Sequence, residues 1–270
     1  MGTPPVILSI AGYDPSSGAG VTADVKTAAA LGCYAVTCIT AVTMQDTQGV
    51  YGVEALGTHL VDGTLKLLAE DFEIAAVRMG MLGSTEVAAT VAAFLDSHKL
   101  PNVVLDPVIR SSSGTPLLDD HGLHVLREML PLCHVITPNV AEAGILAGSE
   151  GIGEGQDWEA AFPQLRRAAS ALHDLGSKAV VITGGHLNPA NDFLSDARSR
   201  VMQEEVFPGE RIQSHSTHGT GCAFATALAC RLALGDDLRE AVRRAKQYVR
   251  NAILAAYPLG KGVGPLNHFA

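Results

Sequence analysis

The sequence has little that would place it in a membrane or in an oxidising compartment. Although 47% of the 270 residues are hydrophobic, no uninterrupted apolar run approaches the roughly 20 residues that cross a bilayer. No basic segment precedes the first apolar stretch, MGTPPVILSIAG, so this stretch predicts a first strand and not a signal peptide. The five cysteines are scattered, with no CxxC pair and no His/Cys cluster at zinc spacing. We therefore expect no disulfide framework and no metal knuckle, and a reducing, cytoplasmic location.

Basic residues are also in deficit. The chain has 19 Lys and Arg against 28 Asp and Glu, a formal net charge of −9. Such a charge disfavours binding to phosphate backbones and anionic lipid, so we expect no nucleic-acid partner and no membrane partner. Two nucleotide-binding signatures, GxGxxG and GxxxxGK[ST], are absent as well. Their absence disfavours classical NAD binding and a P-loop NTPase.

The sequence does contain a regular alternation of short apolar runs with longer periodic segments. The runs predict strands over 6–12, 34–42, 74–82, 102–108, 134–139 and 178–185, and a polar antiparallel excursion over 193–216. The periodic segments predict helices over 19–31, 58–70, 85–98, 120–130, 157–175, 220–234 and 236–256. Trp158, alone in an acidic helix, is expected to pack at the surface. This rhythm is typical of an α/β fold whose parallel sheet has helices on both faces, and we expect a single domain over residues 1–270.

Ligands of open parallel sheets bind beyond the carboxyl ends of the strands, so the loops there are the candidate binding segments. The segment THGTGC (217–222) leads into an Ala-rich helix, where two glycines let backbone N–H groups converge and the helix dipole attracts an anion. Cys222 in the first turn would feel the same field, which favours its thiolate and could make the sulfur a base or nucleophile. The alternative is a closely packed helix start with Cys222 as inert filler.

Three further loops carry unusual residues. The segment AGYDPSSGAG (11–20) allows close backbone approach by a ligand, and Asp24 follows it in a first helical turn, where a structural role is equally open. Asn139 and Glu142 have an N-x-x-E spacing whose oxygens suit a hydrated Mg²⁺, although helix capping explains the pattern equally well. Asp106 is a carboxylate at the end of a buried strand.

Together and in order, these segments resemble one family. The runs AGYDPSSGAGVTADVKT, AVTMQDTQGV, RMGMLGS, VVLDPV, ITPNVAEA, TGGH, THGTGC and VGPLNHF are similar to hydroxymethylpyrimidine/phosphomethylpyrimidine kinases of thiamine biosynthesis, from about residue 6 to residue 269. The resemblance implies a three-layer ribokinase-like fold and a homodimer. It also implies transfer of the ATP γ-phosphate, with Mg²⁺, to the hydroxymethyl group of 4-amino-5-hydroxymethyl-2-methylpyrimidine, and then a second phosphorylation to the diphosphate.

The resemblance also implies roles for single residues. The anion hole over the transferring phosphoryl group would be formed by Gly219, Thr220, Gly221 and Cys222, with Cys222 where sugar-kinase relatives have an Asp base. Gln45 would hydrogen-bond the pyrimidine edge, in a pocket with Gly12, Asp24, Met81 and Val108. The nucleotide and its phosphates would be bound by Asn139, Glu142, Thr183 and His218, with Asn139 and Glu142 holding Mg²⁺ through water.

The chain departs from the family pattern at four positions. Family members usually have Ser or Thr at Tyr13, Gly at Ser17, and Lys at both Ser112 and Thr183. Both of the missing lysines are expected near the phosphates. Arg110, in the same segment as Ser112, is a candidate to supply part of the missing charge.

Three other functions share some of these sequence features. Pyridoxal kinases of the cysteine-containing branch share THG-x-GC, but the segment 110–113 here lacks the second cysteine expected of that branch, and Gln45 favours a pyrimidine edge. A ligand-binding protein without kinase activity is favoured by the missing lysines and disfavoured by the intact THGTGC, Asn139 and Glu142. A nicotinamide oxidoreductase is disfavoured by the missing fingerprint.

Overall fold

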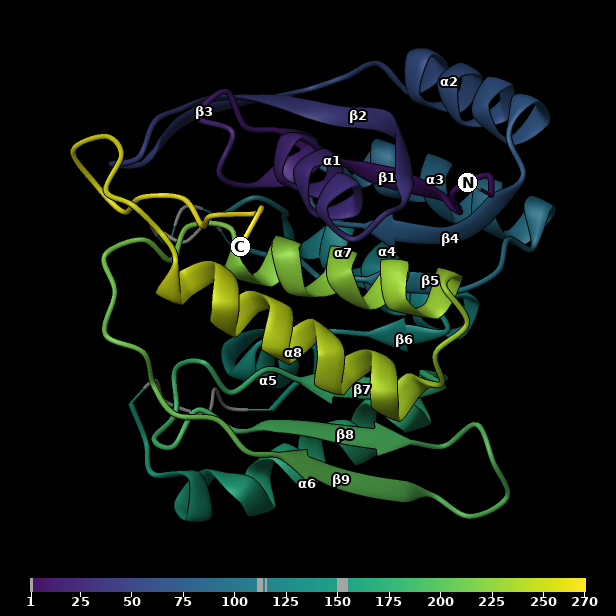
Figure 1. The fold of residues 1–270 in the computed structure, drawn as a ribbon. Helices are drawn as coiled ribbons and strands as arrows, with labels where there is room; N and C mark the ends of the chain where they lie inside the picture. Colours follow the sequence, from purple (N-terminus) through teal and green to yellow (C-terminus); the bar gives the residue numbers. More distant parts are fainter. Residues whose placement is uncertain (1, 111–113, 115, 150–154) are drawn as a thin grey trace.

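The fold is built on one twisted sheet (Figure 1). The computed structural model describes residues 2–110, 114, 116–149 and 155–270. Within these residues the sheet has nine strands in the order β3-β2-β1-β4-β5-β6-β7-β8-β9. The strands are β1 Val6–Tyr13, β2 Tyr34–Gln45, β3 Val50–Ala55, β4 Ile74–Met79, β5 Val103–Leu105, β6 Val135–Ile136, β7 Ala179–Ile182, β8 Asp192–Asp196 and β9 Gln203–Phe207.

Six adjacent strands, from β2 to β7 in the sheet order, run parallel. Antiparallel pairs occur at both edges, where β3 pairs with β2, and β8 and β9 follow β7. The predicted parallel sheet and the predicted antiparallel excursion after 193 are therefore confirmed. Strand β3 was not predicted. It arises because β2 continues to Gln45 and the chain reverses over Asp46–Gly49, where the Asp46 carboxylate accepts the backbone N–H groups of Gln48 and Gly49.

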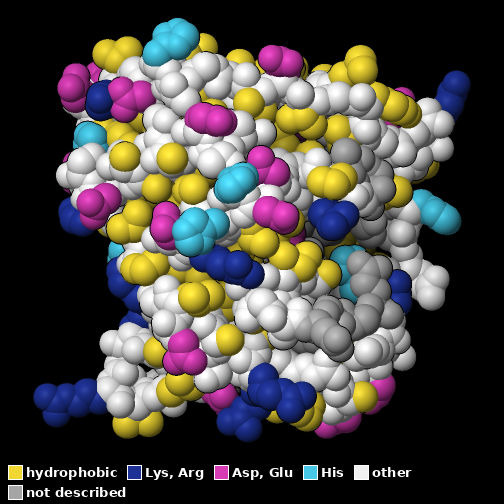
Figure 2. All heavy atoms as spheres, turned by 180° about the vertical axis from the view of Figure 1, so that it is seen from behind, with side chains coloured by type: hydrophobic (Ala, Val, Ile, Leu, Met, Phe, Trp, Pro, Cys, Tyr) yellow, Lys and Arg dark blue, Asp and Glu magenta, His cyan; other side chains and the backbone are white. Residues whose placement is uncertain are grey.

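Helices cover both faces of the sheet. Helices α1 Gly20–Ala30, α7 Thr220–Ala233 and α8 Leu238–Leu254 lie in front in Figure 1. Helices α2 Thr58–Asp71, α3 Thr85–His98, α4 Asp120–Met129, α5 Val140–Ala147 and α6 Trp158–Asp174 lie behind, with the short 3-10 turn Leu130–Leu132 after α4. Acidic and basic side chains are scattered among apolar ones over this back face (Figure 2).

The sheet separates two hydrophobic cores, because successive side chains of a strand point to opposite faces. Leu8 and Ile10 of β1 pack behind the sheet against α2 and α3, whereas Ile7 packs in front with α7 and α8. The limits of the seven helices whose ranges were predicted agree with the structure to within about two residues, whereas no range was predicted for α5. The position of Trp158 differs from the prediction. Its side chain is only 4% exposed and stacks on Phe162 in the back core, so the predicted surface position is wrong.

The carboxyl ends of the parallel strands meet at one edge of the sheet. The loops after β1, β5, β6 and β7 begin there, and the loop that starts α7 reaches the same edge from the front layer. In the part of the chain that the structure describes, no helix combines the length and the apolar character that crossing a bilayer requires.

Candidate active site

A pocket of about 2100 Å³ opens at this edge of the sheet. That is more than a single small ligand needs. Its lining includes all but one of the residues that the sequence singled out for binding or catalysis: Gly12, Gln45, Met81, Val108, Asn139, Glu142, Thr183, His218, Gly219, Thr220, Gly221 and Cys222. The exception is Asp24, which lies beneath the pocket.

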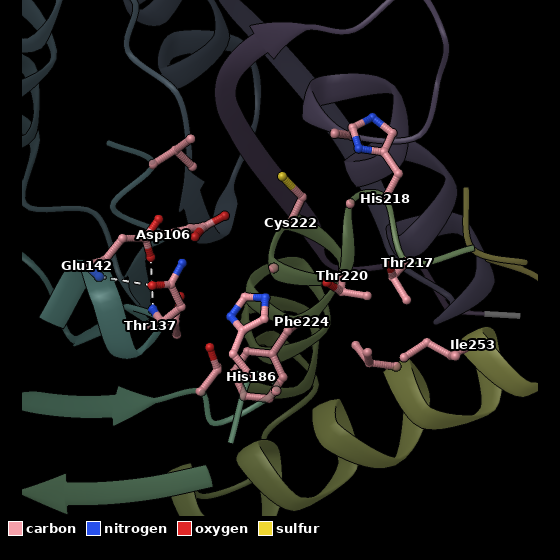
Figure 3. Close-up of a pocket in the computed structure, with 18 of the residues that line it drawn as sticks. Asp106, Thr137, Glu142, His186, Thr217, His218, Thr220, Cys222, Phe224 and Ile253 are labelled. Carbon is pink, nitrogen blue, oxygen red and sulfur yellow. Dashed lines mark hydrogen bonds between the residues drawn. The ribbon is translucent and has the colours of Figure 1, made fainter. Parts of the chain in front are cut away.

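The first turn of α7 faces the pocket without a side-chain cap. Its N-cap residue, Gly219, has a φ of +82° and makes no side-chain hydrogen bond to the helix start. A Cβ at Gly219 would lie 1.8 Å from the carbonyl oxygen of Gly18, so only glycine lets these two loops meet. The first N–H groups of a helix have no intrahelical acceptor, so those that follow Thr220 are available to an anion, while the N–H of Thr220 itself reaches the carbonyl of Thr217 at 3.4 Å. Figure 3 shows Thr220 and Cys222 at this turn, with Asp106 and Glu142 on one side and His218 on the other.

A buried ion cluster supports this turn from below. The guanidinium of Arg78, on β4, lies 3.1 Å from the Asp24 carboxylate and 2.7 Å from the Asp106 carboxylate. Asp24 also accepts hydrogen bonds from the hydroxyls of Ser9, at 2.6 Å, and Thr226, at 2.7 Å. Asp24 is fully buried, and its oxygens are taken by these three partners. The expectation that Asp24 contacts the substrate is therefore corrected: it joins β1, β4 and α7.

The thiol of Cys222 is not the activated thiolate that the helix start led us to expect. Burial raises its pKa to about 11, and the nearby carboxylates Asp106 and Asp24 add to the rise. The Arg78 guanidinium and the N–H of Gly20 act in the opposite direction but do not overcome burial. Arg78 and Asp106 both lie close enough to the thiol to influence its pKa. At neutral pH the free protein therefore carries a neutral thiol beside a carboxylate.

Asn139 and Glu142 form a complete capping box at the start of α5. The Asn139 side chain accepts the N–H of Glu142 at 2.9 Å, and the Glu142 carboxylate accepts the N–H of Asn139 at 2.8 Å. The capping explanation of this spacing is therefore confirmed, and it is compatible with ligand binding because both residues line the pocket. Burial, together with the charge of Asp106, raises the pKa of Glu142 to about 8.

These carboxylates fit a hydrated cation better than a dehydrated one. Among the described residues, no three His, Cys, Asp or Glu side chains are grouped so as to hold a metal ion. Yet Asp106 and Glu142 are close enough for the charge of one to raise the pKa of the other. A divalent cation nearby would relieve that repulsion, and Mg²⁺ keeps most of its waters when it binds through one or two carboxylates and substrate phosphates.

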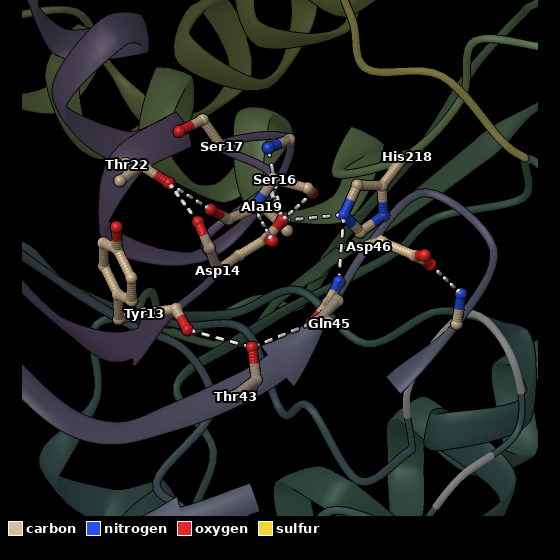
Figure 4. Close-up of polar contacts among 12 residues, drawn as sticks. Tyr13, Asp14, Ser16, Ser17, Ala19, Thr22, Thr43, Gln45, Asp46 and His218 are labelled. Atoms are coloured by element: carbon tan, nitrogen blue, oxygen red, sulfur yellow. Dashed lines mark hydrogen bonds and ion pairs between the residues drawn. The ribbon is translucent and has the colours of Figure 1, made fainter. Parts of the chain in front are cut away.

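The opposite end of the pocket is a mixed apolar and polar wall. The methyl carbon of Met81 would lie 2.4 Å from a Cβ on Gly12, so this glycine lets the thioether lie across the strand end. The amide of Gln45 lies 3.2 Å from the Thr43 hydroxyl and 3.2 Å from Nε2 of His218 (Figure 4). Nε2 of His218 also lies 2.8 Å from the Asp14 carboxylate. His218 was expected to bind phosphates; the structure instead directs its ring to Asp14 and Gln45.

The expected phosphate-side residues lie together. Thr183 follows β7, bridges to Asn139, and donates its N–H to the carbonyl of Pro138 at 2.9 Å. Arg110 is exposed at the rim, where its guanidinium reaches the carbonyl of Gly114 at 3.5 Å. Ser112, at the other expected lysine position, lies outside the described residues.

Sequence reasoning missed two functional candidates. The apolar periodicity places Arg78 within a strand run, although an arginine in such a run signals a buried partner, because an unpaired buried charge is too costly. The sequence places Asp14 in a Gly-rich loop, although Asp before Pro-Ser-Ser is a frequent acceptor of nearby backbone N–H groups. Asp106 was noted as a strand-end acid, without a partner or a role.

Comparison with known proteins assigns the chain to a family. The profile of a family described as phosphomethylpyrimidine kinase matches residues 14–267. The chain is 41% identical over 268 residues to a hydroxymethylpyrimidine/phosphomethylpyrimidine kinase of Streptomyces coelicolor, covering 98% of this chain and 95% of the relative. It is also 41% identical over 265 residues to a bifunctional thiamine biosynthesis protein of Geobacter sulfurreducens, covering 97% of this chain but spanning only 52% of that relative's length.

Solved structures agree on the fold. An ADP complex of Bacillus subtilis pyridoxal kinase superposes with a TM-score of 0.85 at 32% identity, covering 98% of both chains. A phosphomethylpyrimidine kinase of Clostridium difficile superposes with a TM-score of 0.77 at 33% identity, covering 92% of this chain and 99% of that one. The expected ribokinase-like, three-layer architecture is thus confirmed, and the chain belongs to the phosphomethylpyrimidine kinase family.

Proposed function

We propose that the protein transfers the γ-phosphate of ATP to the hydroxymethyl group of 4-amino-5-hydroxymethyl-2-methylpyrimidine, and then phosphorylates the monophosphate to the diphosphate, as a step of thiamine biosynthesis. The observation that carries this proposal is the uncapped first turn of α7, which faces a large pocket beside Asp106 and Glu142. Phosphoryl transfer requires positioning and stabilisation of spreading negative charge, and converging backbone N–H groups supply both. Family membership supports the reaction class.

ATP would lie with its phosphates between the start of α7 and the β6–α5 loop. Gly219, Thr220 and Gly221 would donate backbone N–H groups to the transferring phosphoryl, and Thr183 lies on the same side of the pocket as Asn139. The ADP complex of the Bacillus subtilis relative supports a nucleotide in this fold. Mg²⁺, held through water by Asn139 and Glu142, would offset the charge of the phosphates when bound.

The substrate ring would lie at the other end, against Gly12, Met81 and Val108, with Gln45 at its polar edge. A flat ring suits the flexible thioether of Met81, which adapts to irregular surfaces. The hydroxymethyl group would then point towards the first turn of α7. This placement aligns the attacking oxygen with the phosphoryl group held by the backbone N–H groups.

The proton of the attacking hydroxyl would leave by way of Cys222 and Asp106. A thiol whose pKa is raised to about 11 is a poor base before reaction. In a loose transition state, however, the hydroxyl loses its proton late, once its oxygen has begun to bond to phosphorus. Cys222 then relays the proton: as it takes the hydroxyl proton, its own passes to the nearby carboxylate of Asp106. Arg78 holds that carboxylate in place at 2.7 Å.

A second candidate activity is phosphorylation of pyridoxal. The observation in its favour is the TM-score of 0.85 with the Bacillus subtilis pyridoxal kinase. Gln45 is the residue that argues against it, since its amide suits a paired donor and acceptor on one ring edge. Beyond the reaction itself, we propose that the chain acts as a single domain, as a homodimer and in the cytoplasm.

The test is ATP consumption by the purified protein with the hydroxymethylpyrimidine, its monophosphate and pyridoxal offered separately. We expect turnover on both pyrimidines. Turnover on pyridoxal alone would replace the proposal by the second candidate. Tight binding of the pyrimidine with no turnover on any of the three would favour a non-catalytic binding protein.

A further inference from the structure

A short polar chain runs across the substrate end of the pocket (Figure 4). It joins the Asp14 carboxylate to Nε2 of His218 at 2.8 Å, Nε2 of His218 to the Gln45 amide at 3.2 Å, and the amide to the Thr43 hydroxyl at 3.2 Å. The four residues come from three segments far apart in sequence. Each link constrains the proton positions of the next.

Asp14 is an immobile acceptor at one end of this chain. Its carboxylate accepts the backbone N–H groups of Ser16, at 2.8 Å, Gly18, at 3.2 Å, and Ala19, at 2.9 Å, besides the Ser16 hydroxyl. Burial raises its pKa, but the hydrogen bonds from His218 and Ser16 outweigh burial and hold the pKa below its usual value. An ionised carboxylate can only accept, so Nε2 of His218 must carry a proton and donate it to Asp14.

Close packing restricts the ring of His218 to the orientation in which Nε2 contacts the Asp14 carboxylate. A Cβ at Gly18 would lie only 2.3 Å from Cδ2 of the ring, so the ring packs directly against the loop that carries Asp14. Its side chain is 11% exposed, and that of Asp14 is 4% exposed. The pair is therefore shielded from water, which strengthens the hydrogen bond and keeps its geometry.

A protonated Nε2 determines how the amide of Gln45 is turned. As drawn, the nitrogen end of the Gln45 amide faces Nε2 of His218 and its oxygen end accepts from the Thr43 hydroxyl. A ring nitrogen that carries a proton has no lone pair for that amide nitrogen, so the amide turned by 180°, with its oxygen towards His218, is the orientation that fits; the two ends of an amide are assigned by their partners. The Thr43 hydroxyl has one proton, for which the carbonyl of Tyr13 at 3.0 Å is an acceptor. Thr43 then accepts from the amide nitrogen. Both neighbours of Gln45 are satisfied by the same orientation.

We propose that Asp14 and His218 are positioning residues that hold the Gln45 amide in one orientation, so that the pocket selects a ring edge with an amine beside an unprotonated ring nitrogen. Thus held, the amide offers its second oxygen lone pair on the His218 side and its second N–H on the Thr43 side. A 4-aminopyrimidine edge matches this pattern, with its amine towards His218. A 4-oxo edge, with its protonated ring nitrogen, presents the reverse pattern. The inference rests on the proposed function and adds what sets its substrate selectivity.

The experiment compares two substrates and three variants. The substrates are 4-amino-5-hydroxymethyl-2-methylpyrimidine and its 4-oxo analogue, and the variants are His218→Leu, His218→Gln and, as a control, His124→Leu on the exposed face of α4. A site built to hydrogen-bond one pattern rejects the other strongly, so we expect the wild type to favour the amine by about 100-fold or more in kcat/KM.

In His218→Leu the amide is free to turn, so we expect the preference to fall about tenfold or more, through a higher KM for the amine with kcat changed less than about threefold. His218→Gln keeps an N–H donor for Asp14 and should restore most of the preference, whereas His124→Leu should match the wild type. A merely structural role would not give this split between KM and kcat.

Three results would overturn the inference: an active wild type that accepts both substrates equally, an unchanged preference in His218→Leu, or a loss confined to kcat. The first needs no variant, so the inference stays testable even if His218→Leu does not fold. A wild type active on neither pyrimidine would instead refute the proposed function, which is a separate result.

Discussion

Replacing Arg78 by methionine would remove the positive charge that two buried carboxylates share. The Arg78 and Asp24 side chains are both 0% exposed, and Asp106 is 7% exposed. Methionine has a similar length but no charge and no donors, so Asp24 would keep only its two hydroxyl partners. Asp106 would lose the cation at 2.7 Å.

The expected loss in the free energy of unfolding is about 3–5 kcal/mol, because removing one partner leaves an uncompensated buried charge. This is a large part of the roughly 5–15 kcal/mol that stabilises a typical protein. A matched control is Arg166→Met, which breaks an arginine–carboxylate pair with Glu204 at 2.9 Å, where the two side chains are 56% and 31% exposed. Exposed pairs contribute about 0.2–1 kcal/mol.

Urea unfolding at pH 7 measures both variants against the wild type. Adding Asp24→Asn to Arg78→Met should recover part of the loss, with a coupling energy of about 1–3 kcal/mol, since the amide removes one uncompensated charge. If Arg78→Met costs no more than Arg166→Met, burial does not determine the strength of this ion pair and the reasoning is refuted.

Three further predictions follow from Cys222 and His268. Cys222→Ala should lower kcat about 100-fold if the thiol relays the proton, while Cys230→Ala, further along the same helix, should leave kcat unchanged; equal effects would contradict a role for Cys222. Alkylation of Cys222 by iodoacetamide should accelerate about tenfold per pH unit from pH 7 to pH 10, because the raised pKa of about 11 keeps the thiol neutral there; a plateau near pH 8 would contradict it. Burial, with a smaller effect of Lys26, lowers the pKa of His268 to about 4, so its stabilising effect is full above pH 6.5 and is lost as the pH falls towards 4. Between pH 7.5 and pH 5, urea unfolding of the wild type should therefore lose about 2 kcal/mol more than that of His268→Gln, and equal losses would refute this assignment.

Much of the fold could be predicted from periodicity. Helix α3 was predicted at its observed limits, because Ser84 caps its start and the apolar positions recur at helical spacing. The β2–β3 hairpin was missed, because its turn, Asp46–Gly49, relies on an Asp side chain that binds backbone N–H groups rather than on an Asn-Gly pair. The burial of Trp158 was missed because its neighbours in sequence are acidic, whereas its contacts are made with Phe162 and the back core.

The candidate site was predictable in its parts but not in its electrostatics. The glycines and the helix start of THGTGC are local features, and their place at the edge of the sheet follows from strand order. The pKa of Cys222 is not local, because it depends on burial and on the carboxylates of Asp106, which follows β5, and of Asp24 on α1. The helix dipole, which the sequence does reveal, lowers the pKa of Cys222, but burial raises it by more.

By itself, therefore, the sequence determined the element order, the parallel sheet, the anion-binding turn and the family resemblance, since these follow from short-range spacing and motif order. Only the tertiary structure decided that Asp24 lies beneath the pocket with Arg78, and that the ring of His218 contacts Asp14 and Gln45. Those contacts join residues more than 50 positions apart. Charges and hydrogen bonds act over a few ångströms in space, so their partners are determined by how the strands and loops meet, which no local pattern records.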